Sequence, residues 1–394
     1  MFYHQAKKSK FNFNIIEDYQ SIDSKENLNA PFFAKSDFLK HSADVNPQVR
    51  HIMIEASSDN KTLANFYFQI MPFKGSELKS YIPQGEDCII NKTMEAMVDM
   101  ALERVNWNLA VMGNVFVTGD NGQYWKTDNL ADEIKWEIVE EASSFLFKNL
   151  KVDAYLISDL REEDLKGHDK LLQNGYRFFE VEPDLIFDID SSWSSFDDYM
   201  ASVVSKYRVR TKKVLEKSTL LDIRDLDLDS LITQEKEIYQ LYKNVIDSAA
   251  FKLVEITADY FHKFKKVHPN LFFVKGFYLE NKLVGVISYF EDTEVLYMNF
   301  VGLDYTFNKD HCIYQRVLYD AIEQGILKGK KHIHFGRTAS EIKTAVGAKP
   351  VKAYSLLKHN SKIPNMAIKP LTSYLKPEPF QVRHPFKSKA KVSS

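Results

Sequence analysis

The chain has little of several residue types and patterns whose presence would place it in a particular class of protein. Its 394 residues include only two cysteines, Cys88 and Cys312, which are too few for a disulfide framework and lack the spacing of zinc ligands. No stretch approaches the roughly 18 consecutive apolar residues that span a bilayer, and the segment from Met1 to Lys10 lacks the apolar core of a secretory signal. We therefore expect a cytoplasmic protein with no membrane span and no bound metal.

A strong excess of charge of one sign is also absent. The net charge of −2 gives no general attraction to nucleic acid or anionic membrane, so binding of a polyanion would have to be local. Glycine (14) and proline (12) are modest, whereas phenylalanine (28) and tyrosine (20) are abundant, which favours sheets with aromatic cores. A chain of this length exceeds the usual size of a single core, so we expect two domains.

The first half predicts an antiparallel strand pair followed by alternating helices and strands. Strands are predicted at 51–55, 63–72, 109–117, 152–157 and 178–189, and helices at 94–105, 127–150 and 161–173. This order is typical of an α+β domain with one parallel crossover. We place its end at residue 190, before a small polar junction in which Ser195 and Asp198 have capping-box spacing.

The second half, residues 191–360, contains a clearer pattern. Three strands joined by tight polar turns predict a meander, and helices and strands surround it: strands at 220–226, 271–279, 283–290, 295–303, 332–335 and 351–358, helices at 231–249, 257–267, 310–328 and 340–345. Residues 361–394 alternate prolines with lysines and arginines, which predicts an extended basic tail. Its aromatic residues could attach it to the body, or it could be a solvated terminus.

The most informative motif follows the strand at 332–335. It reads Phe335-Gly336-Arg337-Thr338, then Lys343, then Gly347-Ala348. Two cations at the end of a crossover suit an acyl or phosphate-bearing donor, because fixed positive charge is most valuable where negative charge sits or develops. The alternative is structural: Arg337 pairs with Glu341, and Lys343 is a solvent-exposed group.

The element order and this motif together resemble the GNAT acyltransferase superfamily, in particular the FemAB-like and BioF-like bacterial proteins. The resemblance extends from about residue 30 to residue 358. It implies two tandem GNAT-like domains, each a mixed, mostly antiparallel sheet with one parallel βαβ crossover flanked by helices. It also implies an N-acyltransferase without a tightly bound cofactor, in which the donor is acyl-CoA or aminoacyl-tRNA. The acceptor would be an amine on a small molecule, a peptide or a cell-wall precursor.

We predict a catalytic group on the C-terminal domain. Direct attack of an amine on an activated acyl group needs proton removal and oxyanion stabilisation but no side-chain nucleophile. The resemblance implies that backbone N–H groups of residues 297–301 stabilise the oxyanion. The catalytic candidates are Arg337, Lys343, Glu341 and Tyr297; Asn299 and Tyr314 are candidates for contact with the donor or for proton transfer.

The turn Thr118-Gly119-Asp120-Asn121-Gly122 lies where GNAT domains place their pyrophosphate loop. Gly119 and Gly122 are therefore predicted to bind the donor, because glycines allow backbone N–H groups to approach phosphate. The Gln/Arg-x-x-Gly-x-Gly/Ala pattern of the superfamily is absent, however, and Asp120 would repel phosphate. A plain turn is the alternative. The corresponding loop of the second domain, residues 306–310, also lacks glycine.

A basic helix is predicted after residue 200. Its cations at 206, 210, 213 and 217 lie at helical spacing, and we predict that Lys206, Arg208 and Arg210 bind substrate, with RNA (aminoacyl-tRNA) as a partner. The alternative is the solvent-exposed face of an amphipathic helix.

His332 and His334 alternate on a strand, and we interpret them as structural residues. A non-catalytic GNAT-fold module that binds a nucleotide-linked or RNA partner is the second functional hypothesis, and an acetyl-CoA-dependent enzyme whose active half is the N-terminal domain is the third. The sequence does not indicate an oligomeric state.

Overall fold

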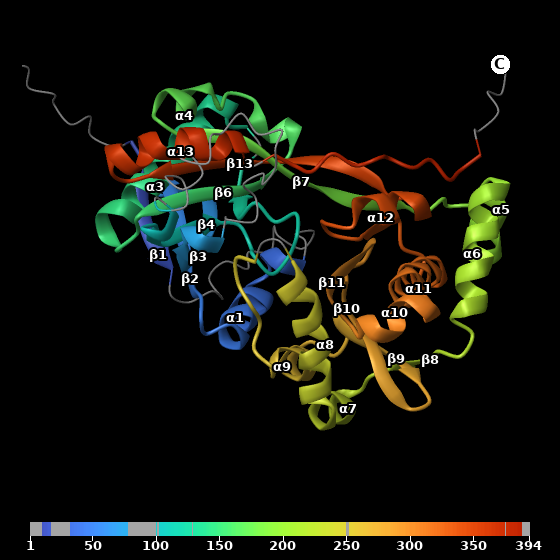
Figure 1. Cartoon of the computed structure of the whole chain (residues 1–394). Coiled ribbons are helices and arrows are strands. Elements are labelled where there is room, and N and C mark those ends of the chain that lie inside the picture. Colours follow the sequence, from blue (N-terminus) through green and yellow to red (C-terminus); the bar gives the residue numbers. More distant parts are fainter. Residues whose placement is uncertain are drawn as a thin grey trace, which may run out of the picture. The chain divides into compact units, whose positions relative to one another are not determined.

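A computed structural model describes residues 10–16, 32–77, 100, 102–127, 129–249, 252–374 and 376–387. The chain divides into two compact units (Figure 1). Unit 1 comprises Met1–Val181 and Ala353–Lys376, and unit 2 comprises Glu182–Lys352 and Pro377–Ser394. The chain passes from unit 1 to unit 2 after Val181, near the predicted boundary after residue 190. The predicted division does not include the return of residues 353–376 to unit 1.

Unit 1 is built on a mixed sheet with the strand order β1-β2-β3-β4-β6-β13. All neighbouring pairs are antiparallel except β4 and β6, which run parallel. The short strand β5 pairs with β3 beside β4. The strands are β1 Asn12–Ile16, β2 Arg50–Ser58, β3 Lys61–Lys74, β4 Asn106–Met112, β5 Gln123–Trp125, β6 Ala154–Leu160 and β13 Lys349–His359.

The helix between β4 and β6 covers one face of this sheet. Along β3, Phe66 and Phe68 alternate with more polar positions and share a core with Trp136, Val139 and Ala142 of that helix. The period of two in the strand and of three to four in the helix gives the two apolar surfaces that pack together. The described helical segments of unit 1 are η3 Phe32–Ala34, α1 Ser36–Val45, α3 Asp132–Asn149, η5 Glu162–Leu165, α4 Asp169–Gln173 and α13 Lys362–Tyr374.

Unit 2 repeats this plan with the strand order β7-β12-β11-β10-β9-β8. Its single parallel pair is β11 with β12, and the other neighbours are antiparallel. Residues 182–188 of β7 belong to this unit, and the preceding residues of β7 belong to unit 1. The strands are β7 Arg177–Asp188, β8 Asp222–Asp225, β9 Phe272–Leu279, β10 Lys282–Glu291, β11 Val295–Leu303 and β12 His332–His334.

Helices cover both faces of the unit 2 sheet (Figure 1). The helix between β11 and β12, α11, buries Val317 and Ile322 in a core with Leu296 and Ile333, whereas α8 and α9 lie on the opposite face. The predicted meander and the parallel crossover are both present. The helices are α5 Phe196–Ser202, α6 Ser205–Lys217, α7 Leu228–Thr233, α8 Glu235–Ser248, α9 Tyr260–Val267, α10 Tyr305–His311, α11 Ile313–Leu327 and α12 Ser340–Val346.

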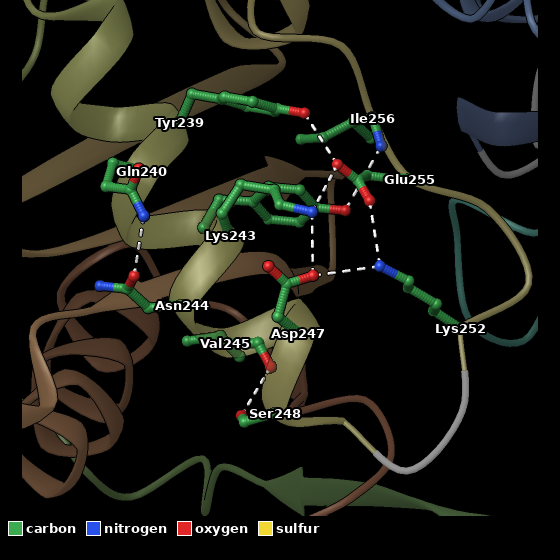
Figure 2. Close-up of polar contacts among 11 residues, drawn as sticks. Tyr239, Gln240, Lys243, Asn244, Val245, Asp247, Ser248, Lys252, Glu255 and Ile256 are labelled. Atoms are coloured by element: carbon green, nitrogen blue, oxygen red, sulfur yellow. Dashed lines mark hydrogen bonds and ion pairs between the residues drawn. The ribbon is translucent and has the colours of Figure 1, made fainter.

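Four charged side chains fasten the segment after α8 to that helix (Figure 2). The ammonium nitrogen of Lys243 lies 2.9 Å from carboxylate oxygens of Asp247 and Glu255, and that of Lys252 lies 3.1 and 3.2 Å from the same two carboxylates. Tyr239 donates its hydroxyl to Glu255 at 2.8 Å. The alternating charges form a closed ring that fixes the chain leading into α9.

Two predicted helices are each interrupted in the structure. The capping box of Ser195 and Asp198 and the basic residues after 200 lie on two separate helices, α5 and α6. Between them Arg208 donates from Nε to the carbonyl of Met200 at 3.1 Å and from Nη2 to that of Val203 at 2.9 Å. These bonds satisfy carbonyls that the end of α5 leaves open. The helix predicted at 310–328 is α10 and α11, separated by Cys312 in the left-handed region at φ 50°. The predicted capping box of Ser195 and Asp198 is confirmed.

The prediction of an extended tail from residue 361 is wrong for Lys362–Tyr374, which form α13. Pro364 lies in the first turn, where a missing N–H costs nothing. Asn365 donates to the carbonyl of Gly175 at 2.9 Å and accepts from the N–H of His359 at 2.8 Å, and Ile368 is buried. Phe386, beyond this helix, packs in unit 2 against Phe187, so this aromatic residue does attach the last described segment.

The predicted fold class is confirmed. Each unit is a mixed, mostly antiparallel sheet with one parallel crossover and flanking helices. The predicted helix at 94–105 lies largely outside the described residues, as does Cys88. Within the described part of the chain, no helix has the length and apolar character needed to cross a membrane.

Candidate functional site

The parallel pairing in unit 2 is short, and the sheet opens beyond it. Residues 295–297 of β11 pair with residues 332–334 of β12, and the last registered pair is Tyr297 with His334. β11 continues to Leu303 along β10. The chain after β12 stays with β7, because Phe335 donates its N–H to the carbonyl of Leu185 at 2.8 Å. We call this divergence, formed by residues 298–303 and 335–339, the β11–β12 fork.

A β-bulge in β11 lies at the base of the fork. Between the pairs Ile287–Val301 and Tyr289–Met298, β10 advances by two residues and β11 by three. The hydroxyl oxygen of Ser288 accepts the N–H of Phe300 at 3.0 Å and so replaces a ladder bond. A bulge bends its strand and increases its twist, which directs β11 away from β12.

Polar and aromatic side chains occupy one face of the sheet beside the fork. Ile333 faces the α11 core, so the alternation along the strand places His334 on the opposite face. The rings of Tyr297 and His334 are in contact, with centroids 4.6 Å apart and planes inclined by 56°. On the same face, the side-chain oxygen of Asn299 accepts from the hydroxyl of Tyr260 on α9 at 3.2 Å.

The turn after β12 has a strained backbone. Thr338 and Ala339 both adopt left-handed conformations, at φ 64° and 47°, directly before α12. Each such residue costs on the order of 1–3 kcal/mol, and a β-branched threonine is an outlier there. Strain of this kind persists only where surrounding contacts hold the chain in place.

A buried lysine and an ion pair supply those contacts. Lys343 is 3% exposed and donates from Nζ to the carbonyl of Arg337 at 2.6 Å. Arg337, whose side chain is 28% exposed, donates from Nε to Asp184 at 3.2 Å, and that carboxylate on β7 is 1% exposed. Burial lowers the pKa of Lys343 to about 7, and the charge of Asp184 partly opposes this effect. Both predicted cations therefore lie at the end of β12, where they stabilise the turn; their contact with an acyl donor stays a prediction.

Glu341 and Tyr314 lie in different surroundings. Glu341 on α12 is paired with Arg383 from the last described segment, with Nε at 3.0 Å from its carboxylate. Tyr314 lies at the start of α11, where its N–H donates to the side chain of Asn308 at 2.9 Å and burial raises the pKa of its hydroxyl. None of these contacts brings Glu341 or Tyr314 to Tyr297 and His334.

In unit 1, the loop that contains Gly119 and Gly122 folds back onto β3. The N–H of Gly122 donates to the carboxylate of Asp120 at 2.9 Å, and its carbonyl accepts the N–H of Tyr67 at 2.9 Å. Asp120 is 2% exposed, and burial raises its pKa to about 6. The loop is followed by β5 rather than directly by a helix. The N–H of Gly122 is therefore already bonded within the loop, and donor binding by Gly119 and Gly122 stays a prediction.

The basic helix is α6. Lys206 and Arg210 are exposed, and both lie near the Tyr207 ring, with Nζ of Lys206 at 5.9 Å and Cζ of Arg210 at 5.8 Å from its centroid. Arg208 instead points its guanidinium at the end of α5, as described above. Of the three predicted substrate-binding residues, two lie on the exposed face and one caps a neighbouring helix.

The two histidines predicted to alternate on a strand, His332 and His334, both lie on β12 but at different points of the sheet. His332 lies where β11 and β12 are still paired, and its Nδ1 is 2.9 Å from Asp188. His334 lies at the last pair before the fork. Because the sequence predicts this strand to residue 335, no pattern in it distinguishes His334 as the last pair before the fork. Among the described residues, no three His, Cys, Asp or Glu side chains gather as a metal site would require.

Two solved structures share this architecture across nearly the whole chain. A structure of FemX has 10% identical residues and a TM-score of 0.55, over 90% of this chain and 100% of that one. A tandem GNAT protein from the clavulanic acid biosynthesis pathway has 7% identity and a TM-score of 0.51, over 89% and 99% of the two chains. At identities this low, the structural similarity establishes the fold alone. The chain has the tandem GNAT fold that the sequence resemblance implied. No family model and no curated protein matches the sequence.

Proposed function

We propose that the chain is an N-acyltransferase whose reaction takes place at the β11–β12 fork of unit 2. Two observations carry this proposal together: the β11–β12 ladder ends at Tyr297 and His334, and β11 has a bulge opposite Ser288 of β10. A strand that leaves its neighbour exposes backbone N–H groups, and an acyl group lying along that strand can direct its carbonyl oxygen at them. The tandem GNAT fold supports the same assignment.

The protein's part in the reaction is positioning and electrostatics. An acceptor amine attacks the acyl carbonyl directly, and N–H groups among residues 297–301 stabilise the oxyanion. The N–H of Phe300 is not one of them, since it donates to Ser288. Arg337 adds positive charge at the other branch of the fork, while Lys343 holds the carbonyl of that same residue.

For the donor we propose acyl-CoA or aminoacyl-tRNA, and for the acceptor an amine of a small molecule, a peptide or a cell-wall precursor. Lys206 and Arg210 on the exposed face of α6 would hold RNA phosphates if the donor is aminoacyl-tRNA. Arg208 is excluded from that role because its guanidinium is bonded to the end of α5. Gly119 and Gly122 of unit 1, predicted from the sequence to bind the donor, have no part in this proposal, because the buried carboxylate of Asp120 beside Gly122 would repel a phosphate.

The test is a turnover screen with defined donors. Acetyl-CoA, an acyl carrier protein thioester and alanyl-tRNA are each mixed with a set of primary amines, and amide formation is followed by mass spectrometry. Ser288→Ala should lower turnover about tenfold or more, because the bulge loses the hydroxyl that holds Phe300, at a cost of about 1 kcal/mol in stability. Ser355→Ala, at a buried strand serine of unit 1, is the control. Tight binding of a donor without any turnover would contradict an enzyme and support a non-catalytic binding module.

A further inference from the structure

One residue beside the fork has the chemistry that direct acyl transfer requires and that the predicted catalytic group lacks. An attacking amine must lose a proton, and histidine is the side chain most often used for this near neutral pH. Tyr297 and Asn299 are poor bases, and Glu341 is paired with Arg383. Lys343 is buried, and its Nζ donates to the carbonyl of Arg337 rather than facing an acceptor amine. His334 is half-buried and belongs to the last registered pair of the parallel ladder.

The position of His334 follows from the strand register. Its cross-strand partner on β7 is Ile186. His332, two residues earlier on the same face, lies opposite Asp188 and is bonded to it. His332 thus lies within the paired sheet, bonded to Asp188, and His334 lies at the point where the sheet opens.

Aromatic and acidic residues lie on the same face of the sheet as His334. Tyr297 contacts its ring from β11, and Tyr260 of α9 reaches the same face through Asn299. Asp184 and Asp188 lie diagonally on β7; Asp184 is paired with Arg337, and Asp188 with His332 and Lys349.

We infer that His334 is the general base of the acyl transfer, and this inference rests on the proposed function. The amine nitrogen forms a bond to the acyl carbon, and the carbonyl electrons move to the oxygen held by the backbone of β11. A ring nitrogen of His334 accepts the proton from the attacking nitrogen. The carbonyl then re-forms, the bond to the thiol or hydroxyl leaving group breaks, and that group takes the proton from His334. The sum is one amine and one acyl donor converted into one amide and one free thiol or alcohol.

The test compares His334→Ala with His332→Ala, a matched histidine on the same strand and face. It uses the donor and amine that the wild-type protein turns over, and it measures kcat and KM from pH 5.5 to 8.5 together with the melting temperature. His334→Ala should lower kcat about 100- to 1,000-fold with little change in KM, and imidazole added to the buffer should restore part of the rate. The wild type and His332→Ala should share a fall in rate on the acid side of the profile, where a histidine base becomes charged, and His334→Ala should lack it.

Three results overturn the inference in distinguishable ways. If His334→Ala turns over like His332→Ala, His334 is not the base, although the proposed function stands. If kcat falls but the pH profile keeps its shape and imidazole gives no rescue, the residue acts only in packing. If the wild type turns over none of the donor and amine pairs, the proposed function fails, and the assignment of His334 fails with it.

Discussion

The two parallel crossovers have the same topology but end differently. In unit 1, residues 109–112 of β4 pair with residues 154–157 of β6, and the loop after β4 then returns to β3. Tyr67 on β3 accepts the N–H of Gly113 at 3.2 Å and donates its own N–H to Gly122 at 2.9 Å. In unit 2, β11 bulges and continues beside β10. Unit 1 thus uses its own loop to continue pairing along β3, whereas unit 2 leaves a divergence between two strands.

This difference indicates why the chemistry is assigned to unit 2. The loop in unit 1 places a buried carboxylate, Asp120, beside Gly122, where an anionic donor would be repelled. The turn in unit 2 places a buried cation, Lys343, beneath Arg337. Asp120 follows the first parallel strand of its crossover and Lys343 follows the second, and these two buried groups have opposite charge. The stabilities of the two units should therefore respond to pH in opposite directions.

The largest expected effect concerns the buried cation of unit 2. With a pKa lowered from 10.5 to about 7, Lys343 binds fewer protons in the folded protein than in the unfolded chain between these values. Stability should consequently rise with pH through this window, by roughly 4–5 kcal/mol if the whole shift is expressed. Lys343→Met should remove this rise in urea unfolding at pH 7, 8 and 9, and the exposed Lys349→Met should keep it. An unchanged slope in the Lys343 variant would contradict the burial of that charge.

The opposite slope is expected from unit 1. The pKa of Asp120 is raised from 3.8 to about 6, so the folded protein binds more protons than the unfolded chain between these values. The contribution of Asp120 to the free energy of unfolding is present below about pH 4 and is lost as the pH rises through 6. This loss amounts to about 3 kcal/mol. Asp120→Asn keeps the acceptor for Gly122 and should flatten stability between pH 4 and 7. A variant that keeps the wild-type pH dependence would show that this carboxyl group titrates normally.

A backbone substitution tests how tightly the unit 1 loop is closed. Gly122 has φ 67°, and an added Cβ would lie 2.5 Å from the nitrogen of Gly113 and 2.6 Å from the carbonyl oxygen of Tyr67. Gly122→Ala should cost about 2–3 kcal/mol. Gly329→Ala is the control, because that glycine has a similar φ of 63° with open space around it, and it should cost only about 1 kcal/mol. Equal melting temperatures for the two variants would contradict the close return of the loop to β3.

The ring of charges on α8 should give the smallest effect. Lys252 and its partners are partly exposed, so each contact is screened by solvent. Lys252→Ala should cost less than about 1 kcal/mol and leave turnover unchanged, as should Lys263→Ala, which removes a single surface pair with Asp259. A larger loss of turnover in the Lys252 variant alone would connect the segment before α9 to the reaction.

Much of the fold could be predicted from local patterns in the sequence. The meander follows from period-two strands and tight turns, and the capping box of Ser195 follows from the spacing of two residues. The breaks between α5 and α6 and between α10 and α11 could not be predicted. The first depends on Arg208 reaching back to carbonyls of α5, and the second on a single left-handed residue, Cys312. Neither leaves a signal in the hydrophobic period.

The candidate site was only partly predictable for a related reason. The motif around Arg337 correctly places two cations after β12, because a strand end can be read from sequence. The partners of these cations cannot be predicted from the sequence, since Asp184 lies on a strand more than 150 residues earlier. The bulge in β11 opposite Ser288 depends on the register between two strands, and so does the end of the β11–β12 ladder at His334; neither can be read from a local pattern.

The central claim is that the donor binds along β11 at the fork of unit 2. Hydrogen–deuterium exchange tests it most directly, with the donor that supports turnover added to the wild-type protein. The account predicts slower exchange for peptides that contain residues 298–303 and 335–339, and no change for residues 113–122 of unit 1. Protection confined to residues 113–122 would contradict the account and assign donor binding to unit 1.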